Sequence, residues 1–153
     1  MRKLLRKKEI RKLEGLIKEE ILKKVKLEEF KDNEGDFIFS NGIPLLFKFN
    51  NSWVLTLHSF IKEFNEVQYK KIIVDAGAIK FIVNGADIMR PGITKINLEI
   101  EKGEILIIKE ETHNKSLALG VALFSGQEMG SMDSGKVIKS LHYVGDFIWN
   151  KKL

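Results

Sequence analysis

The segment at 74–92 carries three glycines, Gly77, Gly85 and Gly92, around a short apolar repeat. Between the first two glycines, the apolar residues recur at the spacing of one helix face: Ala78, Ile79, Ile82 and Val83. This pattern predicts a short amphipathic helix over 77–84, followed by a short strand and a turn at the third glycine. Small residues beside cationic ones leave backbone N–H groups uncovered, so the loop suits a phosphate. A plain helix between two turns has the same spacing.

Positive charge is concentrated at the start of the chain. The 153 residues carry a net charge of +5, and residues 1–12 alone hold seven Lys or Arg against one Glu. Such a segment either adds salt-sensitive affinity for phosphates or forms the solvated end of a helix. A hydrophobic content of 44% is that of a globular protein, in one domain or two small ones.

Composition excludes several kinds of chemistry. The chain has no cysteine, which rules out disulfides, thiol nucleophiles and cysteine-based zinc sites, and agrees with a cytoplasmic location. Its three histidines, His58, His113 and His142, share no metal-binding spacing, and no carboxylate pair has the spacing of a general acid and base. No apolar run is long enough to span a bilayer. We therefore expect no enzyme activity, no metal, no cofactor and no membrane partner.

The first half predicts helices followed by a small antiparallel sheet. Apolar residues repeat at helical spacing over about 3–25, in one or two helices with a break near Gly15. Strands are expected at 37–39, 45–49 and 53–57, with an Asn41-Gly42 turn between the first two and a helix over 59–65 after the last. The four phenylalanines that alternate on these strands, Phe37, Phe39, Phe47 and Phe49, predict a face turned to a core.

The second half predicts one early helix among many short strands, which is the pattern of a small barrel. Asp75 precedes the glycine segment and is expected to cap its helix. Further strands are expected at 96–100, 104–109 and 117–124, with a bulge or bend at Gly120. Residues 125–135 are expected to form a long loop, and Trp149 to close the barrel.

Four motifs of the second half resemble one known family. They read VDxGAIKFxxxGAxIMxPGI from Val74, then GEILII, LALGVALFSG and LHYVGDFIWN. They resemble the PUA domain, a compact RNA-binding β-barrel, and most closely that of the malignant T-cell amplified sequence family and its archaeal relatives. The resemblance implies an α+β fold, in which a small N-terminal α/β pre-PUA domain (residues 1–70) packs on a C-terminal PUA pseudo β-barrel (residues 71–153). The pre-PUA match is looser, and it departs from the family at 55–57, where a proline is expected near Thr56.

The resemblance also implies a function and a site. PUA domains bind structured RNA, including the acceptor end of tRNA, through the glycine loop and neighbouring strands. The matching positions are Gly77, Lys80, Asn84, Gly85, Ala86, Arg90, Pro91 and Gly92. Lys80 and Arg90 are expected to meet phosphates, and the glycines to permit close approach. The implied partners are tRNA or rRNA, the small ribosomal subunit and a protein partner, in initiation or recycling.

Two other functions fit the same sequence. PUA domains are often fused to pseudouridine synthases and archaeosine transglycosylases, so this chain could supply RNA recognition to such an enzyme as a separate subunit. The pre-PUA half, or the leucine-rich face over 4–22, could instead serve as a protein-interaction surface.

Overall fold

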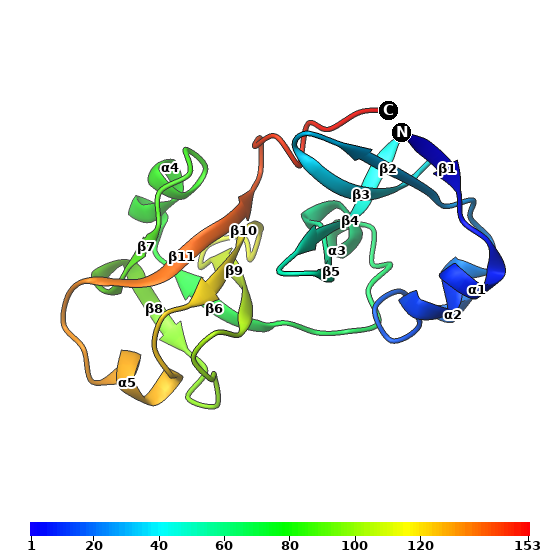
Figure 1. The fold of residues 1–153 in the computed structure, drawn as a ribbon. Helices are drawn as coiled ribbons and strands as arrows, with labels where there is room; N and C mark the ends of the chain where they lie inside the picture. The colour runs from blue at the N-terminus through cyan, green and yellow to red at the C-terminus, as the bar shows by residue number, and fades with distance from the viewer. The chain divides into compact units, whose positions relative to one another are not determined.

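The computed structural model describes all residues, 1–153, and they divide into two compact units. The first unit comprises residues 1–68 and 147–153, and the second comprises residues 69–146. Each unit has its own sheet and short helices (Figure 1). The predicted α+β fold class is confirmed.

The first unit is built on a five-stranded sheet in the order β1-β2-β3-β4-β5, with every pair antiparallel. Its strands are β1 (Arg2–Leu4), β2 (Glu28–Asp32), β3 (Gly35–Ser40), β4 (Ile43–Phe49) and β5 (Ser52–Leu55). Its helices are α1 (Lys7–Ile10), η1 (Arg11–Leu13), α2 (Glu19–Leu22) and α3 (Leu57–Ile61), where η marks a 3-10 helix. The predicted hairpin turn is confirmed, because Asn41 and Gly42 both have the positive φ that such turns require.

The N-terminal region differs from the expected helices. The predicted break is present at Gly15, with φ of +89°, but only three short helical turns form. Residues 2–4 instead form a strand that pairs with β2, which the sequence pattern did not predict. The apolar repeat is still buried, since Leu13 and Ile17 are each 1% exposed. The core face is confirmed for Phe37, Phe39 and Phe47, whereas Phe49 is half-buried.

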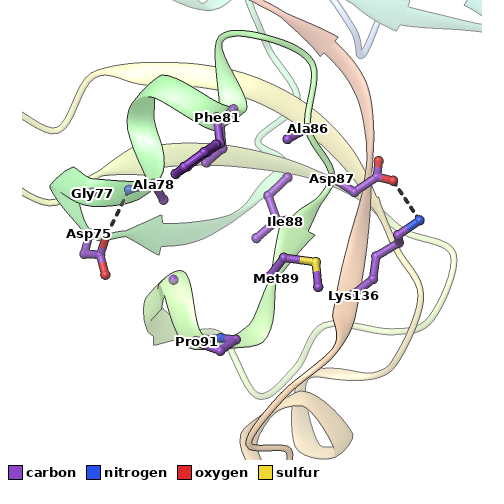
Figure 2. A pocket seen from close by; sticks show the side chains of 12 residues that line it. Asp75, Gly77, Ala78, Phe81, Ala86, Asp87, Ile88, Met89, Pro91 and Lys136 are labelled. Atoms are coloured by element: carbon purple, nitrogen blue, oxygen red, sulfur yellow. Dashed lines mark hydrogen bonds and ion pairs between the residues drawn. The ribbon is translucent and has the colours of Figure 1, made fainter.

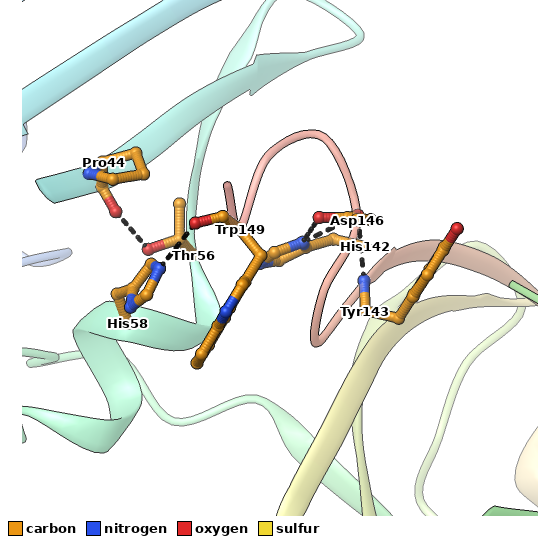
Figure 3. Close-up of polar contacts among 7 residues, drawn as sticks. All are labelled: Pro44, Thr56, His58, His142, Tyr143, Asp146 and Trp149. Carbon is orange, nitrogen blue, oxygen red and sulfur yellow. Dashed lines mark hydrogen bonds and ion pairs between the residues drawn. The ribbon is translucent and has the colours of Figure 1, made fainter. Parts of the chain in front are cut away.

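Helix α3 begins earlier than expected because Thr56 caps it. The Thr56 hydroxyl accepts a hydrogen bond from the Ser59 N–H at 3.4 Å. It donates one to the Pro44 carbonyl at 2.7 Å (Figure 3). The helix is thus tied to β4 at its first turn.

The second unit is built on a six-stranded sheet in the order β7-β11-β10-β9-β6-β8. All neighbours are antiparallel except β6 and β9, which are parallel. Its strands are β6 (Lys70–Val74), β7 (Ile88–Met89), β8 (Ile93–Ile96), β9 (Ile105–Glu110), β10 (Ser116–Ala122) and β11 (Lys136–Tyr143). Its helices are η2 (Ala76–Ala78), α4 (Ile79–Ile82), η3 (Arg90–Gly92) and α5 (Gly126–Gly130). Ile79 and Ile82 of α4 pack on the sheet's hydrophobic core.

Details of the second unit both confirm and correct the expectations. The bend at Gly120 is confirmed by a register shift between β10 and β11. The strand expected at 96–100 lies at 93–96. The expected loop at 125–135 contains helix α5, which a capping box of Ser125 and Glu128 begins. The S-x-x-E spacing of that box was present in the sequence.

Trp149 does not close the barrel, contrary to the prediction. Residues 147–153 belong to the first unit, where the Trp149 ring stacks on His58 with centroids 3.9 Å apart. His58 Nε2 also lies 3.0 Å from the Trp149 carbonyl oxygen (Figure 3). The sheet strand β11 ends at Tyr143, in a turn that Gly145 makes with φ of +93°.

Candidate RNA-binding site

The glycine segment of the second unit encloses a pocket of about 610 Å³. One wall is η2 with α4, and the facing wall is β7 with η3 (Figure 2). The lining residues are Asp75, Gly77, Ala78, Phe81, Ile82, Ala86, Asp87, Ile88, Met89, Pro91, Gly92 and Lys136. Most of them are apolar or small, so the pocket favours a flat or apolar group.

Hydrogen bonds at Asp75 join the two walls. The Asp75 carboxylate accepts from the Ala78 N–H at 3.0 Å, which is the predicted cap of the helix. The Asp75 N–H donates to the Gly92 carbonyl at 2.9 Å. The cap and the η3 turn are therefore fixed to each other at one end of the pocket.

The turn at the other end of α4 is set by Gly85, whose φ of +93° favours glycine. The N–H groups of Gly85 and Ala86 donate to the carbonyls of Ile82 and Phe81, both at 3.0 Å. The Asn84 side chain donates to the Lys80 carbonyl at 2.7 Å. These bonds satisfy the last carbonyls of the helix and direct the chain into β7.

Asp87 and Lys136 form an ion pair of 3.0 Å at the side of the pocket (Figure 2). The Ser140 N–H also donates to the Asp87 carboxylate at 2.8 Å. Desolvation alone would raise the pKa of Asp87, but the Ser140 hydrogen bond and the nearby Lys136 and Lys139 hold that pKa below its ordinary value. Asp87 is therefore ionised near neutral pH, and the cations beside it offset its charge.

Two large apolar side chains stand exposed in the pocket lining. Phe81 on α4 is 58% exposed, and Met89 on β7 is 50% exposed. Leaving such side chains in water is unfavourable, at about 25 cal/mol per Å² of apolar surface. The combination of a pocket with exposed aromatic and thioether groups is typical of a ligand-binding surface.

No histidine lines the pocket. In the second unit, His142 Nδ1 lies 3.0 Å from both carboxylate oxygens of Asp146, and His142 is fully buried (Figure 3). His113 is exposed in the loop between β9 and β10. The structure has no cluster of three or more His, Cys, Asp or Glu side chains that could hold a metal ion. None of its helices has the length and apolar character needed to cross a bilayer.

Comparison with known proteins identifies the family. Residues 70–144 match the PUA domain. The uncharacterized protein MJ1432 of Methanocaldococcus jannaschii is 38% identical over 136 residues, which cover 89% of this chain and 83% of that protein. Translation machinery-associated protein 20 of Saccharomyces cerevisiae is 34% identical over 146 residues, covering 91% of this chain and 80% of that protein. The chain belongs to the translation machinery-associated protein 20 family.

Two further matches agree with this family. Malignant T-cell-amplified sequence 1 of Danio rerio is 34% identical over 82 residues, covering 52% of this chain and 45% of that protein, so the predicted family resemblance is confirmed. A hypothetical protein of Pyrococcus horikoshii, PH0734.1, has a solved structure with a TM-score of 0.76 and 26% identity, covering 98% of both chains. In this translation machinery-associated protein 20 family member, the six-stranded sheet of the second unit is thus the PUA half-barrel. The PUA match covers residues 70–144, and the two compact units divide between residues 68 and 69. The domain division predicted near residue 70 stays a prediction.

The structure brings half of the predicted site residues of this family member into the pocket. Gly77, Ala86, Pro91 and Gly92 line it, and Lys80 is exposed on α4, next to Phe81. Asn84 and Gly85 shape the turn and lie outside the lining. Their roles in binding RNA stay predictions.

Arg90 is the predicted residue with the clearest structural role. Its Nε donates to the Met129 carbonyl at 2.7 Å, and its Nη1 to the Ile93 carbonyl at 3.3 Å. The guanidinium group of Arg90 is thereby held against α5 and the start of β8, and it does not line the pocket.

Eight lining residues were not among the predicted site residues: Asp75, Ala78, Phe81, Ile82, Asp87, Ile88, Met89 and Lys136. A signal for Phe81 was present, because it falls outside the apolar stripe of its own helix. Nothing in the local sequence marks Lys136, which is brought to the pocket by the pairing of β11 with β7.

Proposed function

We propose that this chain is a non-catalytic RNA-binding protein of translation, which holds an unpaired end of tRNA or rRNA in the pocket of its PUA half. The observation that carries this proposal is the exposure of Phe81 and Met89 in an otherwise apolar pocket. Unpaired bases are recognised by stacking on aromatic side chains, which duplex bases cannot do.

The charges around the pocket support an RNA ligand. The Asp87 carboxylate is offset by Lys136, and the Asp75 carboxylate accepts the hydrogen bond that caps η2. Lys80 is exposed on α4, with its Nζ 5.1 Å from the centre of the Phe81 ring. In this arrangement a base would lie against Phe81 and Met89, while Lys80 meets the phosphate that follows it.

The link to translation rests on the family. The yeast relative is named as associated with the translation machinery, and it shares 34% identity over most of both chains. We infer the same setting for this chain, with tRNA or the small ribosomal subunit as the partner.

Binding of a tRNA with an intact single-stranded 3′ end, measured by fluorescence anisotropy, tests this proposal. The Phe81→Ala/Met89→Ala variant should bind at least tenfold more weakly, because base–aromatic stacking contributes about 1–3 kcal/mol per base. Leu98→Ala is the matched control, since Leu98 is also 58% exposed but lies outside the pocket. A tRNA trimmed of its 3′ end should bind the wild type as weakly as the intact tRNA binds the double variant.

Two results would overturn the proposal. One is equal binding of tRNA by the pocket variant and the Leu98→Ala control. The other is the absence of salt-sensitive RNA binding by the wild type, together with a nuclease-resistant association with protein alone. The second result would favour the protein-interaction function.

A further inference from the structure

Five exposed cations fall within residues 6–12 of the first unit, from the N-cap of α1 into η1. They are Arg6, Lys7, Lys8, Arg11 and Lys12, and we call them the basic helix face. All five are exposed, whereas Leu13 on the other side of the same helical segment is 1% exposed. The buried side anchors the segment, so the cations are held on a folded surface.

Few carboxylates compensate this charge. Glu9, the one acidic residue within the segment, forms an ion pair with Lys3 at 3.3 Å. Glu28 and Glu29 of the neighbouring strand pair with Arg2 and Lys31. No ion pair in the structure includes a member of the basic helix face, and Glu14, at the end of η1, is the nearest remaining carboxylate along the chain.

The spacing within the face is unfavourable for the isolated helix. Ile10 and Arg11 both have right-handed helical φ and ψ, so α1 continues directly into η1. Lys7 and Arg11 are four residues apart, as are Lys8 and Lys12, and like charges at this spacing repel each other on a helix. A polyanion bound across the face would relieve this repulsion.

The chemistry of the segment selects phosphates over bases and lipids. The first aromatic residue of the chain is Phe30, so the segment has no ring on which a base could stack. Of its two large apolar residues, Leu13 is buried and Ile10 is partly buried, so the segment lacks the broad apolar face that enters a membrane. Cations without stacking groups bind nucleic acid through its backbone and without regard to sequence.

We propose that the basic helix face is a second RNA-binding site, which binds the phosphate backbone of duplex RNA and acts independently of the pocket. This second site rests on the proposed function only in that both sites bind RNA. It assigns to the first unit a contact that requires no unpaired base.

The test uses two RNA probes and four variants of the full chain. The probes are a blunt RNA duplex, which has no unpaired base for the pocket, and a short single-stranded RNA. The face variant is Lys7→Gln/Lys8→Gln/Arg11→Gln/Lys12→Gln. A matched control removes four exposed cations of the second unit that form no ion pair in the structure: Lys71→Gln/Lys95→Gln/Lys102→Gln/Lys115→Gln. The third variant is Phe81→Ala/Met89→Ala, and the fourth is Lys7→Arg/Lys8→Arg/Arg11→Lys/Lys12→Arg, which keeps the charge.

The face variant should bind the duplex roughly tenfold or more weakly than the wild type at about 0.1 M salt. The slope of log affinity against log salt concentration should become shallower by about 3, since each lost phosphate contact removes about 0.7–0.9 from it. The control, the pocket variant and the charge-keeping variant should bind the duplex like the wild type. A loss in the face variant that the charge-keeping variant shares would indicate damage to the fold and overturn the inference.

The remaining outcomes separate this inference from the proposed function. Equal duplex binding by the face variant and its control overturns the inference, and the pocket proposal still stands if Phe81→Ala/Met89→Ala loses the single-stranded probe. The reverse pattern supports the basic helix face and overturns the pocket. Loss of poly-glutamate binding by the face variant, with unchanged duplex binding, overturns the inference in favour of an acidic protein partner.

Discussion

Gly85 lies against Tyr143, the last residue of β11. A Cβ atom on Gly85 would stand 3.1 Å from the Tyr143 hydroxyl oxygen and 3.2 Å from two of its ring carbons. The ring therefore covers the turn that ends α4, and this turn positions Phe81 and Ala86 on the pocket wall.

We expect Gly85→Ala to destabilise the protein more than a positive φ alone explains. Gly103 is the matched control, because its φ of +90° is close to the +93° of Gly85, but a Cβ atom on Gly103 would meet nothing within 4 Å. Gly103→Ala should cost about 1–2 kcal/mol for the left-handed backbone. Gly85→Ala should cost about 1 kcal/mol more, because the methyl group displaces Tyr143. Chemical denaturation measures both, and equal losses would contradict the packing of Tyr143 on this turn.

We expect Arg90 to contribute to the stability of the fold and Lys80 to contribute to tRNA binding. Arg90→Ala should lower the free energy of unfolding by about 1–3 kcal/mol, because it removes two charge-assisted hydrogen bonds to the Met129 and Ile93 carbonyls. Lys80→Ala should change stability by less than about 0.5 kcal/mol and weaken tRNA binding instead. Thermal melts and tRNA titrations of both variants check this. An Arg90→Ala protein of unchanged stability that loses tRNA would show that the guanidinium group acts on RNA directly.

The hydrogen bond from the Ser140 N–H and the ion pair with Lys136 should make the contribution of Asp87 to stability depend on acid pH. The folded pKa of Asp87 lies below its ordinary value, so its contribution is complete above about pH 4 and is lost as the pH falls through the folded pKa. The melting temperature of the wild type should therefore exceed that of Asp87→Asn at pH 7, and the two should converge toward pH 2. Asp133→Asn serves as control, because Asp133 is exposed and forms no ion pair. A constant difference at every pH would show that the loss in Asp87→Asn is steric.

Local signals predicted the hairpins and the helix of the pocket. Asn41-Gly42 specifies its turn through backbone conformation alone, and Asp75 caps η2 from three residues away. Strand β1 could not be predicted in the same way. Its residues, 2–4, are all exposed and show no alternation, and pairing with Glu28–Phe30, far along the chain, makes them a strand.

The glycine segment was predicted as a binding loop, but only part of the pocket lining within it was named. Gly77 and Gly92 belong to the motif and line the pocket. The orientation of Arg90 depends on the carbonyl of Met129, 39 residues later, and Lys136 arrives through strand pairing. Such contacts depend on the tertiary fold. A sequence motif can therefore locate a binding loop but cannot show which of its cations are free to bind a ligand.

Lys151 offers a test of the C-terminal segment of the first unit. Its ammonium group forms ion pairs with Asp32 and Glu34 and lies 5.1 Å from the centre of the Phe37 ring, and its side chain is 9% exposed. Burial alone would lower the pKa of Lys151, but the two carboxylates outweigh it and hold that pKa above its ordinary value. The contribution of Lys151 to stability is therefore complete below about pH 10 and is lost as the pH rises through the folded pKa.

Lys151→Met should lower the melting temperature at pH 7 by roughly 2–4 °C, the shift that about 1 kcal/mol produces in a chain of this size. The loss combines the cation–π contact with two carboxylates left without their partner. The neighbouring Lys152 is exposed and forms no ion pair, so Lys152→Met should leave the melting temperature within about 1 °C. The difference between the two variants should shrink above pH 10, where wild-type Lys151 loses its proton. If the two variants melt together at pH 7, the segment that carries Lys151 is not held by this ammonium group, and the stacking of Trp149 on His58 becomes the contact to test.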